Sequence, residues 1–284
     1  MSSMKEGRRV KSLDPFTTIV PYIMVERSDS QNTINECFDV KGVEALIRRL
    51  RHDGYDSIGV LHIIIAAYVR TISQRPAINR YIRGQKIYAR NGIVINMAVK
   101  KKMSLDGQET TIKLVLNPSD TLFDVYDKVN NALKEVYEGD EGGVDAAARI
   151  VGYIPGLFKK FAIWVLKTAD YFGLIPSALT AVSPFHGSLF ITNMASLNIP
   201  PIKHHLYNFG NVPVFLAFGA KRAELVLNED GSVSKRRVID FVFNIDERIC
   251  DGYYFASALK IFKKSLVFPE ALLEAPEMVV EDLK

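Results

Sequence analysis

The chain has few cysteines, no long apolar run and little excess of either charge. Cys37 and Cys250 are the two cysteines among 284 residues, and they lack the spacing of metal ligands. We therefore predict neither a disulfide framework nor a metal site, and we expect a reducing, cytoplasmic compartment. The 36 Lys and Arg residues against 32 Asp and Glu residues leave a net charge of +4, which is too small and too evenly spread to indicate a nucleic-acid partner.

Signals for membrane insertion and secretion are also absent from the sequence. No stretch of about 20 apolar residues occurs, so no membrane-spanning helix is predicted. The polar and basic start of the chain is not followed by an apolar run of signal-peptide length, so secretion by that route is not expected. A hydrophobic content of 48% is sufficient for a large core, and one globular domain is predicted over most of the length.

The pattern of apolar residues predicts both helices and strands. Residues 38–51 carry apolar side chains at helical spacing, with Asp39 as the expected N-cap. Residues 58–73 are apolar nearly all round, which is typical of a buried helix that ends before Pro76. Runs rich in β-branched residues predict strands, which cover 86–89, 93–99, 110–116 and several segments after 188, including a hairpin with its turn at 229–231.

The segment 154–175 is unusual because apolar side chains cover most of its helical surface. A narrow polar strip remains around three lysines and one aspartate, so the segment is amphipathic but strongly apolar. Four interpretations stay open: a buried core helix, a helix at a membrane surface, a lid over an apolar substrate, and a subunit contact. The residues of the polar strip are Lys159, Lys160, Lys167 and Asp170.

Four sequence blocks in the last hundred residues carry a resemblance to a known family. They are HGSLFITN from His186, VPVFLAFGA from Val212, VIDFVFNIDERICDG from Val238, and the helical segment ending KKSLVFPEALLE. Their order and spacing resemble the catalytic domain of 2-oxoacid dehydrogenase acyltransferases, the dihydrolipoyl acyltransferases, and the related chloramphenicol acetyltransferase. The resemblance spans residues 12–273 and implies an α/β fold, a mixed sheet with flanking helices. The sequence differs most from the family pattern over residues 138–184.

The resemblance also implies catalytic positions, one of which is changed here. Glu247 stands where the family has its histidine base, and Thr192 falls on the residue that donates a hydrogen bond to the oxyanion. Asp251 and Gly252 match the end of the family's signature. Since a carboxylate is a weaker base than imidazole, with a usual pKa of about 4.3 against about 6.5, other residues remain candidates. The secondary candidates are His186, His204, His205 and Arg248, the last as a partner for Asp251 in place of an arginine that the family carries near residue 16.

The expected organisation follows from the same comparison. Residues 1–12 are predicted to be a loosely attached arm, 13–273 the acyltransferase-like domain with an apolar helical insertion at about 140–183, and 274–284 a C-terminal tail. The chain is expected to form a homotrimer, because family sites lie between subunits. The acyltransferase-like part begins within about a dozen residues of the start, so no lipoyl-bearing module is expected before it. The donor is therefore expected to be free coenzyme A or a carrier thioester, with no bound lipoyl group and no metal.

Two hypotheses on function remain. The first is a stand-alone acyltransferase that moves an acyl group from a coenzyme A or carrier thioester to a thiol or hydroxyl acceptor. The second is a catalytically inactive trimer of the same fold that acts as a binding or scaffold protein. The retained Thr192, Asp251 and Gly252 favour the first hypothesis, whereas the glutamate at position 247 favours the second. The 154–175 helix adds a membrane surface or a long acyl chain as an expected partner.

Overall fold

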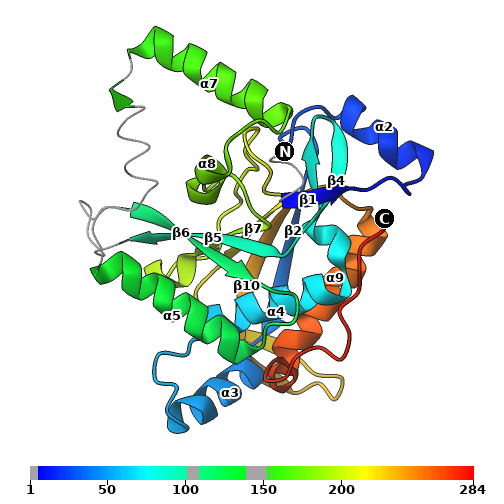
Figure 1. Cartoon of the computed structure of the whole chain (residues 1–284). Helices are drawn as coiled ribbons and strands as arrows, with labels where there is room; N and C mark the ends of the chain where they lie inside the picture. The colour runs from blue at the N-terminus through cyan, green and yellow to red at the C-terminus, as the bar shows by residue number, and fades with distance from the viewer. Residues whose placement is uncertain (1–5, 101–108, 139–151, 154) are drawn as a thin grey trace.

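The structure is a computed structural model, and it describes residues 6–100, 109–138, 152–153 and 155–284. A seven-stranded sheet and a small three-stranded sheet are surrounded by helices (Figure 1). The strands are β1 (Gly7–Arg9), β2 (Gln31–Asp39), β3 (Tyr81–Arg83), β4 (Lys86–Arg90), β5 (Ile93–Lys100), β6 (Glu109–Leu116), β7 (Leu189–Asn193), β8 (Val214–Phe218), β9 (Arg222–Leu227) and β10 (Val233–Asp246). The helices are α2 (Pro15–Ile23), α3 (Lys41–His52), α4 (Val60–Gln74), α5 (Leu122–Glu138), α7 (Gly156–Tyr171), α8 (Ser177–Val182) and α9 (Gly252–Val267), with short 3₁₀ turns at Pro76–Asn79, Met194–Leu197 and Pro269–Leu272.

The large sheet is mixed, as predicted. Its strand order is β2-β10-β8-β7-β5-β6, and β9 pairs with β10 beyond this path. The central strand β7 runs parallel to both of its neighbours, β5 and β8, whereas the other pairs are antiparallel. The small sheet has the order β1-β4-β3. Parallel pairing at the centre requires crossover connections. The β5–β7 crossover contains α5, α7 and α8, whereas the β7–β8 crossover is a loop with one 3₁₀ turn at Met194–Leu197.

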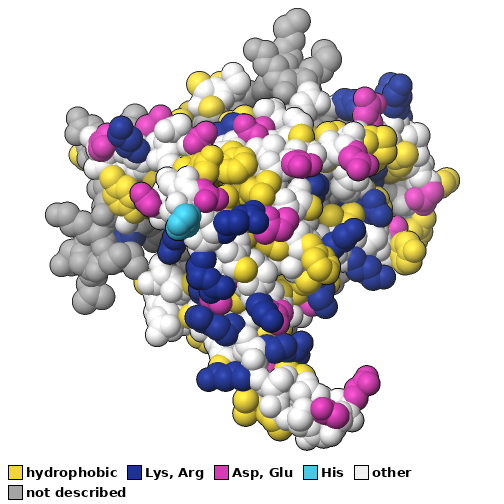
Figure 2. All heavy atoms as spheres, turned by 90° about the horizontal axis from the view of Figure 1, so that it is seen from below, with side chains coloured by type: hydrophobic (Ala, Val, Ile, Leu, Met, Phe, Trp, Pro, Cys, Tyr) yellow, Lys and Arg dark blue, Asp and Glu magenta, His cyan; other side chains and the backbone are white. Residues whose placement is uncertain are grey.

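Four helices cover one face of the large sheet. Apolar residues all round α4 predict burial, and α4 packs against both α5 and α9 with most of its side chains buried. Helix α3 packs against the same core, as predicted, through the apolar stripe Val43, Leu46, Ile47 and Leu50. Seen from below, the outer surface of this side mixes apolar patches with charges of both signs (Figure 2). Helices α2, α7 and α8 lie on the opposite side of the molecule (Figure 1).

Helix α3 begins later than its sequence pattern predicts. Residues 31–39 form β2, whose register runs along the whole second half of β10, and this strand was missing from the prediction. Asp39 is the last residue of β2, and Val40 is the N-cap of α3, so the expected cap was wrong by one residue. The Asp39 carboxylate still accepts a hydrogen bond from the Lys41 backbone N–H at 2.7 Å.

Both ends of the domain are more firmly attached than the sequence indicates. Residues 7–9 form β1, which pairs with β4, so the loose arm predicted over residues 1–12 is wrong for its second half; residues 1–5 lie outside the described part. The predicted tail also packs on the body, since the Val280 N–H donates to the Ser73 carbonyl at 2.8 Å and Asp282 pairs with Arg80. The tail therefore contributes to the surface of the domain.

The apolar insertion forms α7 and α8, except for residues 140–151 and 154, which lie outside the described part. Asp170 is the buried residue of α7, whereas Leu157 is 79% exposed, Phe161 62% and Trp164 60%. The interpretation of this segment as a buried core helix is therefore wrong for the single chain. None of the helices in the described residues is long and apolar enough to span a bilayer.

Candidate active site

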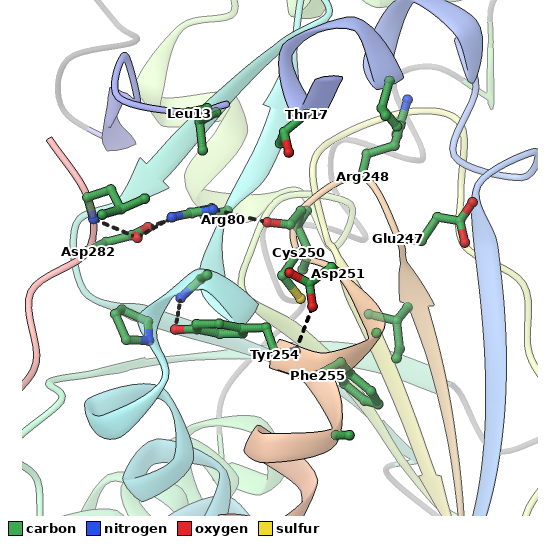
Figure 3. Close-up of a pocket in the computed structure, with 18 of the residues that line it drawn as sticks. Leu13, Thr17, Arg80, Glu247, Arg248, Cys250, Asp251, Tyr254, Phe255 and Asp282 are labelled. Carbon is green, nitrogen blue, oxygen red and sulfur yellow. Dashed lines mark hydrogen bonds and ion pairs between the residues drawn. The ribbon is translucent and has the colours of Figure 1, made fainter. Parts of the chain in front are cut away.

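A cleft of about 880 Å³ opens where β10 ends and α9 begins (Figure 3). Its walls come from α2, the start of β2, the first turns of α9 and the C-terminal segment 280–283. Asp246 ends β10, the chain turns through 247–251, and Asp251 caps α9, so this turn brings its side chains into the wall. Apolar side chains alternate there with polar ones, which include Thr17, Asn32, Arg80, Glu247 and Asp282.

Glu247 lies in this cleft with an exposed side chain. Its carboxylate accepts a hydrogen bond from the Asn32 amide, and its backbone N–H donates to the Ser30 carbonyl at 2.9 Å. Figure 3 shows the carboxylate apart from the Arg80 and Asp282 pair, on the other side of the view. An ionised carboxylate has about four lone-pair sites, so the Asn32 contact leaves room for a proton donor from a ligand. The Glu247 carboxylate is thus accessible from the cleft, and its contact with Asn32 orients it.

A buried ion pair holds the turn that carries Glu247. Arg248 donates to both oxygens of Asp246 at 2.7 Å, and its third nitrogen donates to the backbone carbonyls of Met24 and Val25 at 2.9 and 3.0 Å. The Arg27 guanidinium approaches the same carboxylate at 3.4 Å. Both arginines and Asp246 are buried. This cluster ties the segment after α2 to the end of β10 and fixes the residues on either side of Glu247.

The expected pairing of Arg248 with Asp251 is wrong. Arg248 is committed to Asp246, whereas the exposed Asp251 accepts a hydrogen bond from the Tyr254 N–H at 2.8 Å as the N-cap of α9. Arg8 is not a partner of Asp251 either, because it donates to backbone carbonyls near the C-terminus. Asp251 therefore begins the helix and shapes the turn.

Thr192 does not line the cleft that contains Glu247. It lies on β7 opposite Ala217 of β8 and is half-buried. Leu189 and Ile191 point into the core, so the alternation of a strand places Thr192 on the other face of the sheet. The two residues that the resemblance pairs in catalysis are thus not brought together within one chain.

His186 is a buried structural residue. One ring nitrogen lies 2.8 Å from the Ser183 hydroxyl and the other 3.2 Å from the Asp170 carboxylate, so both nitrogens have partners. Burial raises the pKa of Asp170, but the hydrogen bond from His186 and the charges of His186 and Arg83 outweigh it, and the pKa is held below its usual value. His186 joins α7 to the body and does not line the cleft, so it does not supply a base there.

His204 and His205 lie together in the loop after β7, outside the cleft. The His204 ring stacks on Phe215, with 3.8 Å between ring centres, and its ring nitrogen contacts the His205 carbonyl. Within one chain neither side chain reaches the surroundings of Glu247. Among the described residues there is also no group of three or more His, Cys, Asp or Glu side chains arranged to hold a metal ion.

Several residues that line the cleft were not predicted as site residues from the sequence. Arg80 pairs with Asp282 through two hydrogen bonds, and both side chains are largely buried. Asn32 was missed because its strand was not predicted. Cys250 also lines the cleft, but burial raises the pKa of its thiol to about 12, so it is not a thiolate nucleophile at neutral pH. An Arg-Pro-Ala-Ile-Asn motif at 75–79 directly precedes Arg80, and this was the available signal.

Comparison with solved structures identifies the fold. A probable dihydrolipoamide acetyltransferase from Listeria monocytogenes superposes with a TM-score of 0.57 at 15% identity, over 90% of this chain and 94% of that chain. The dihydrolipoamide acetyltransferase of Azotobacter vinelandii gives 0.57 at 13% identity, over 93% and 94%. A chloramphenicol acetyltransferase gives 0.53 at 14% identity, over 93% and 100%. No protein-family model and no curated protein matches the sequence. The chain has the acyltransferase fold that its sequence blocks indicate.

Proposed function

We propose that this chain is a stand-alone acyltransferase that uses a coenzyme A or carrier thioester as donor and a thiol or hydroxyl as acceptor. The supporting observation is Glu247, which stands in the signature position with an exposed carboxylate in a cleft of about 880 Å³. The surrounding turn is held rigidly by Asp246 and Arg248, as a catalytic group requires. The fold shared with acyltransferases supports the reaction class.

The reaction needs one base and one oxyanion donor. The acceptor gives its proton to Glu247 while its sulfur or oxygen forms a bond to the thioester carbonyl carbon. The carbonyl oxygen becomes an oxyanion, to which the Thr192 hydroxyl donates a hydrogen bond. The intermediate then collapses, the carbon–sulfur bond breaks, and the leaving thiolate takes the proton back from Glu247. Atoms and charge balance without a metal or a redox partner.

Glutamate is a weaker base than histidine in water, so its surroundings must change before it acts. Transfer of a carboxylate into an apolar site disfavours the charged form and raises the pKa, which brings a glutamate closer to neutral pH. In the single chain Glu247 is exposed and lacks such a site. A neighbouring subunit or a bound acyl donor would supply the missing cover over the cleft.

A homotrimer with sites between subunits would cover Glu247 and would also bring an oxyanion donor beside it. Thr192 lies outside the cleft of its own chain, so a second chain is needed to supply the oxyanion donor beside Glu247. We expect light scattering to give about three times the 31.9 kDa of one chain at micromolar concentration. A stable mass of one chain would contradict the proposed site.

Binding of coenzyme A tests the proposed donor. A ligand present at about 100 times its Kd adds about 2.7 kcal/mol to the free energy of unfolding. For a chain of this size we expect the melting temperature to rise by roughly 5–10 °C. The rise is to be measured against coenzyme A concentration, because a specific site gives a graded increase. Acyl thioesters of different chain length are then compared in the same assay.

Two tryptophan substitutions on α9 provide the matched control. Ala256 lines the cleft and Lys263 is exposed elsewhere on the same helix, so Ala256→Trp fills the cleft and Lys263→Trp does not. The coenzyme A response is expected to disappear in the first variant and to persist in the second. If the wild type does not respond, or if both variants respond equally, the cleft is not the donor site.

The second candidate function is an inactive binding or scaffold trimer. It is favoured by one observation, the exposed glutamate in place of the imidazole base. Binding and transfer assays distinguish the two candidates. The scaffold binds coenzyme A or an acyl thioester weakly or not at all and transfers no acyl group, whereas the acyltransferase does both.

A further inference from the structure

Helix α7 presents an apolar stripe to solvent. Leu157, Phe161 and Trp164 recur at i, i+4 and i+7, and each is at least 60% exposed. Phe158 and Val165 widen the stripe on its other border, with exposed fractions of 65% and 43%. An exposed stripe of this kind, with the only tryptophan of the chain, is uncommon on the surface of a protein that works free in water.

The charges that α7 carries at the surface are of one sign. Lys159, Lys160 and Lys167 contribute three positive charges, and Asp170 is the only acidic residue between 156 and 171. Asp170 is buried beside His186 and Arg83, so the carboxylate does not neutralise the lysines at the surface. Lysines beside an aromatic stripe can extend their ammonium groups towards phosphates while their methylene stems stay in apolar contact.

The orientation of this stripe is fixed from the inner side of the helix. The Asp170 carboxylate accepts a hydrogen bond from the Gly210 N–H at 3.1 Å and contacts the His186 ring at 3.2 Å. At the next position the Tyr171 hydroxyl bonds to Gln85. Because these contacts anchor the C-terminal end of α7, its apolar side chains are held outwards.

Helix α2 continues the same surface. Ile19 and Ile23, four residues apart on α2, form a second exposed apolar stripe with exposed fractions of 51% and 69%, whereas Phe16 lines the cleft that contains Glu247. Ile19 lines a groove together with Gln85, the residue that Tyr171 of α7 contacts. Both helices lie at the top of Figure 1, opposite α3 and α5. The basic residues Arg9 and Lys86 line the same groove.

We infer that the α2 and α7 side of this protein binds the surface of an anionic lipid bilayer. The apolar stripes enter the boundary between headgroups and acyl chains, and the lysines of α7 contact lipid phosphates and carboxylates. A second copy of the chain would also cover apolar side chains. The three lysines of α7 form no ion pair with a carboxylate of the described residues, so they match an anionic surface better than a like-charged copy. The inference does not depend on acyl transfer, because lipid binding is measured without turnover.

Sedimentation with vesicles tests the inference on the full chain. We expect binding to vesicles that contain phosphatidylserine and much weaker binding to phosphatidylcholine alone. Raising salt from about 0.1 M to about 1 M shortens the Debye length from roughly 10 Å to roughly 3 Å and should release much of the protein. Lys160→Glu combined with Lys167→Glu should weaken binding by roughly an order of magnitude or more, since each lysine near an anionic surface contributes severalfold in affinity.

A pair of aromatic substitutions separates surface binding from folding. Phe161→Glu should abolish sedimentation with vesicles and leave the melting temperature unchanged, because the side chain is exposed. The control is Tyr137→Glu, an equally exposed aromatic residue on α5 at the other side of the molecule, which should sediment like the wild type. The inference is overturned if the wild type does not bind phosphatidylserine vesicles, or if Phe161→Glu binds as the wild type does. The inference is also overturned if the only effect of Phe161→Glu is to dissociate an oligomer of the protein.

Discussion

Replacing Asp246 by asparagine is expected to lower the free energy of unfolding by about 3–5 kcal/mol. The Asp246 carboxylate is the buried partner of both Arg248 and Arg27, and the substitution leaves two buried guanidinium groups without a counter-charge. Burial lowers the pKa of Arg27, and the charge of Asp246 acts against that effect. The loss is to be measured by urea unfolding, because the midpoint shifts while the dependence on denaturant stays similar.

The matched control is Asp240→Asn on the same strand. Asp240 pairs with Arg222 at 2.6 Å in a partly exposed position, where an ion pair contributes about 0–1 kcal/mol. The difference between the two substitutions therefore measures the effect of burial. Equal losses would show that the Asp246 cluster does not hold the turn at Glu247. A shifted turn should also reduce binding in the cleft, which the coenzyme A assay detects.

The central elements of the fold were predictable because their sequences are unambiguous. The helix α4 and the strands β4, β5 and β6 all lie within about two residues of their predicted ranges. Each combines a run rich in apolar or β-branched residues with a turn or proline at its end, so local preference and burial agree. The hairpin of β9 and β10 was also predicted, and Gly231 in its turn has a φ of +80°.

Strand β2 was missed because its residues do not have a strand composition. The sequence QNTINECFD has one fully buried residue, Phe38, and the strand lies at an edge of the sheet where polar side chains meet solvent. Its formation depends on pairing with β10, a partner about 200 residues away in sequence, and a local pattern does not contain that information. The omission also hid Asn32, the partner of Glu247.

The exposure of α7 could not be predicted from its sequence. A helix with apolar side chains nearly all round is usually buried, and composition alone does not distinguish a core from an unpartnered surface. The decisive feature is that Asp170 meets His186 and Gly210 on the inner side, which directs the stripe outwards. The same contact explains why His186 is structural.

Glu247→Gln is expected to reduce turnover by about 10² to 10⁴-fold, the usual contribution of a general base. The melting temperature should stay unchanged, because the side chain is exposed and an amide still contacts Asn32. Initial rates of acyl transfer from coenzyme A thioesters measure the change. Glu281→Gln is the control, since Glu281 is another exposed carboxylate that lines the cleft. Full activity of Glu247→Gln would place the base elsewhere, and equal losses in both variants would indicate an effect of charge alone.

Mixing this variant with Thr192→Val tests whether the site lies between subunits. Thr192→Val removes the proposed oxyanion donor and keeps the shape of the side chain, and loss of one such donor reduces the rate by about 10² to 10³-fold. Each variant alone is then nearly inactive. In a cyclic trimer made from equal amounts of the two chains, about one interface in four joins an intact Glu247 to an intact Thr192, so roughly a quarter of the wild-type activity should return. Recovery is expected because the cleft of a single chain contains Glu247 without Thr192. No recovery in confirmed mixed trimers would show that both residues act within one chain or that one of them does not act.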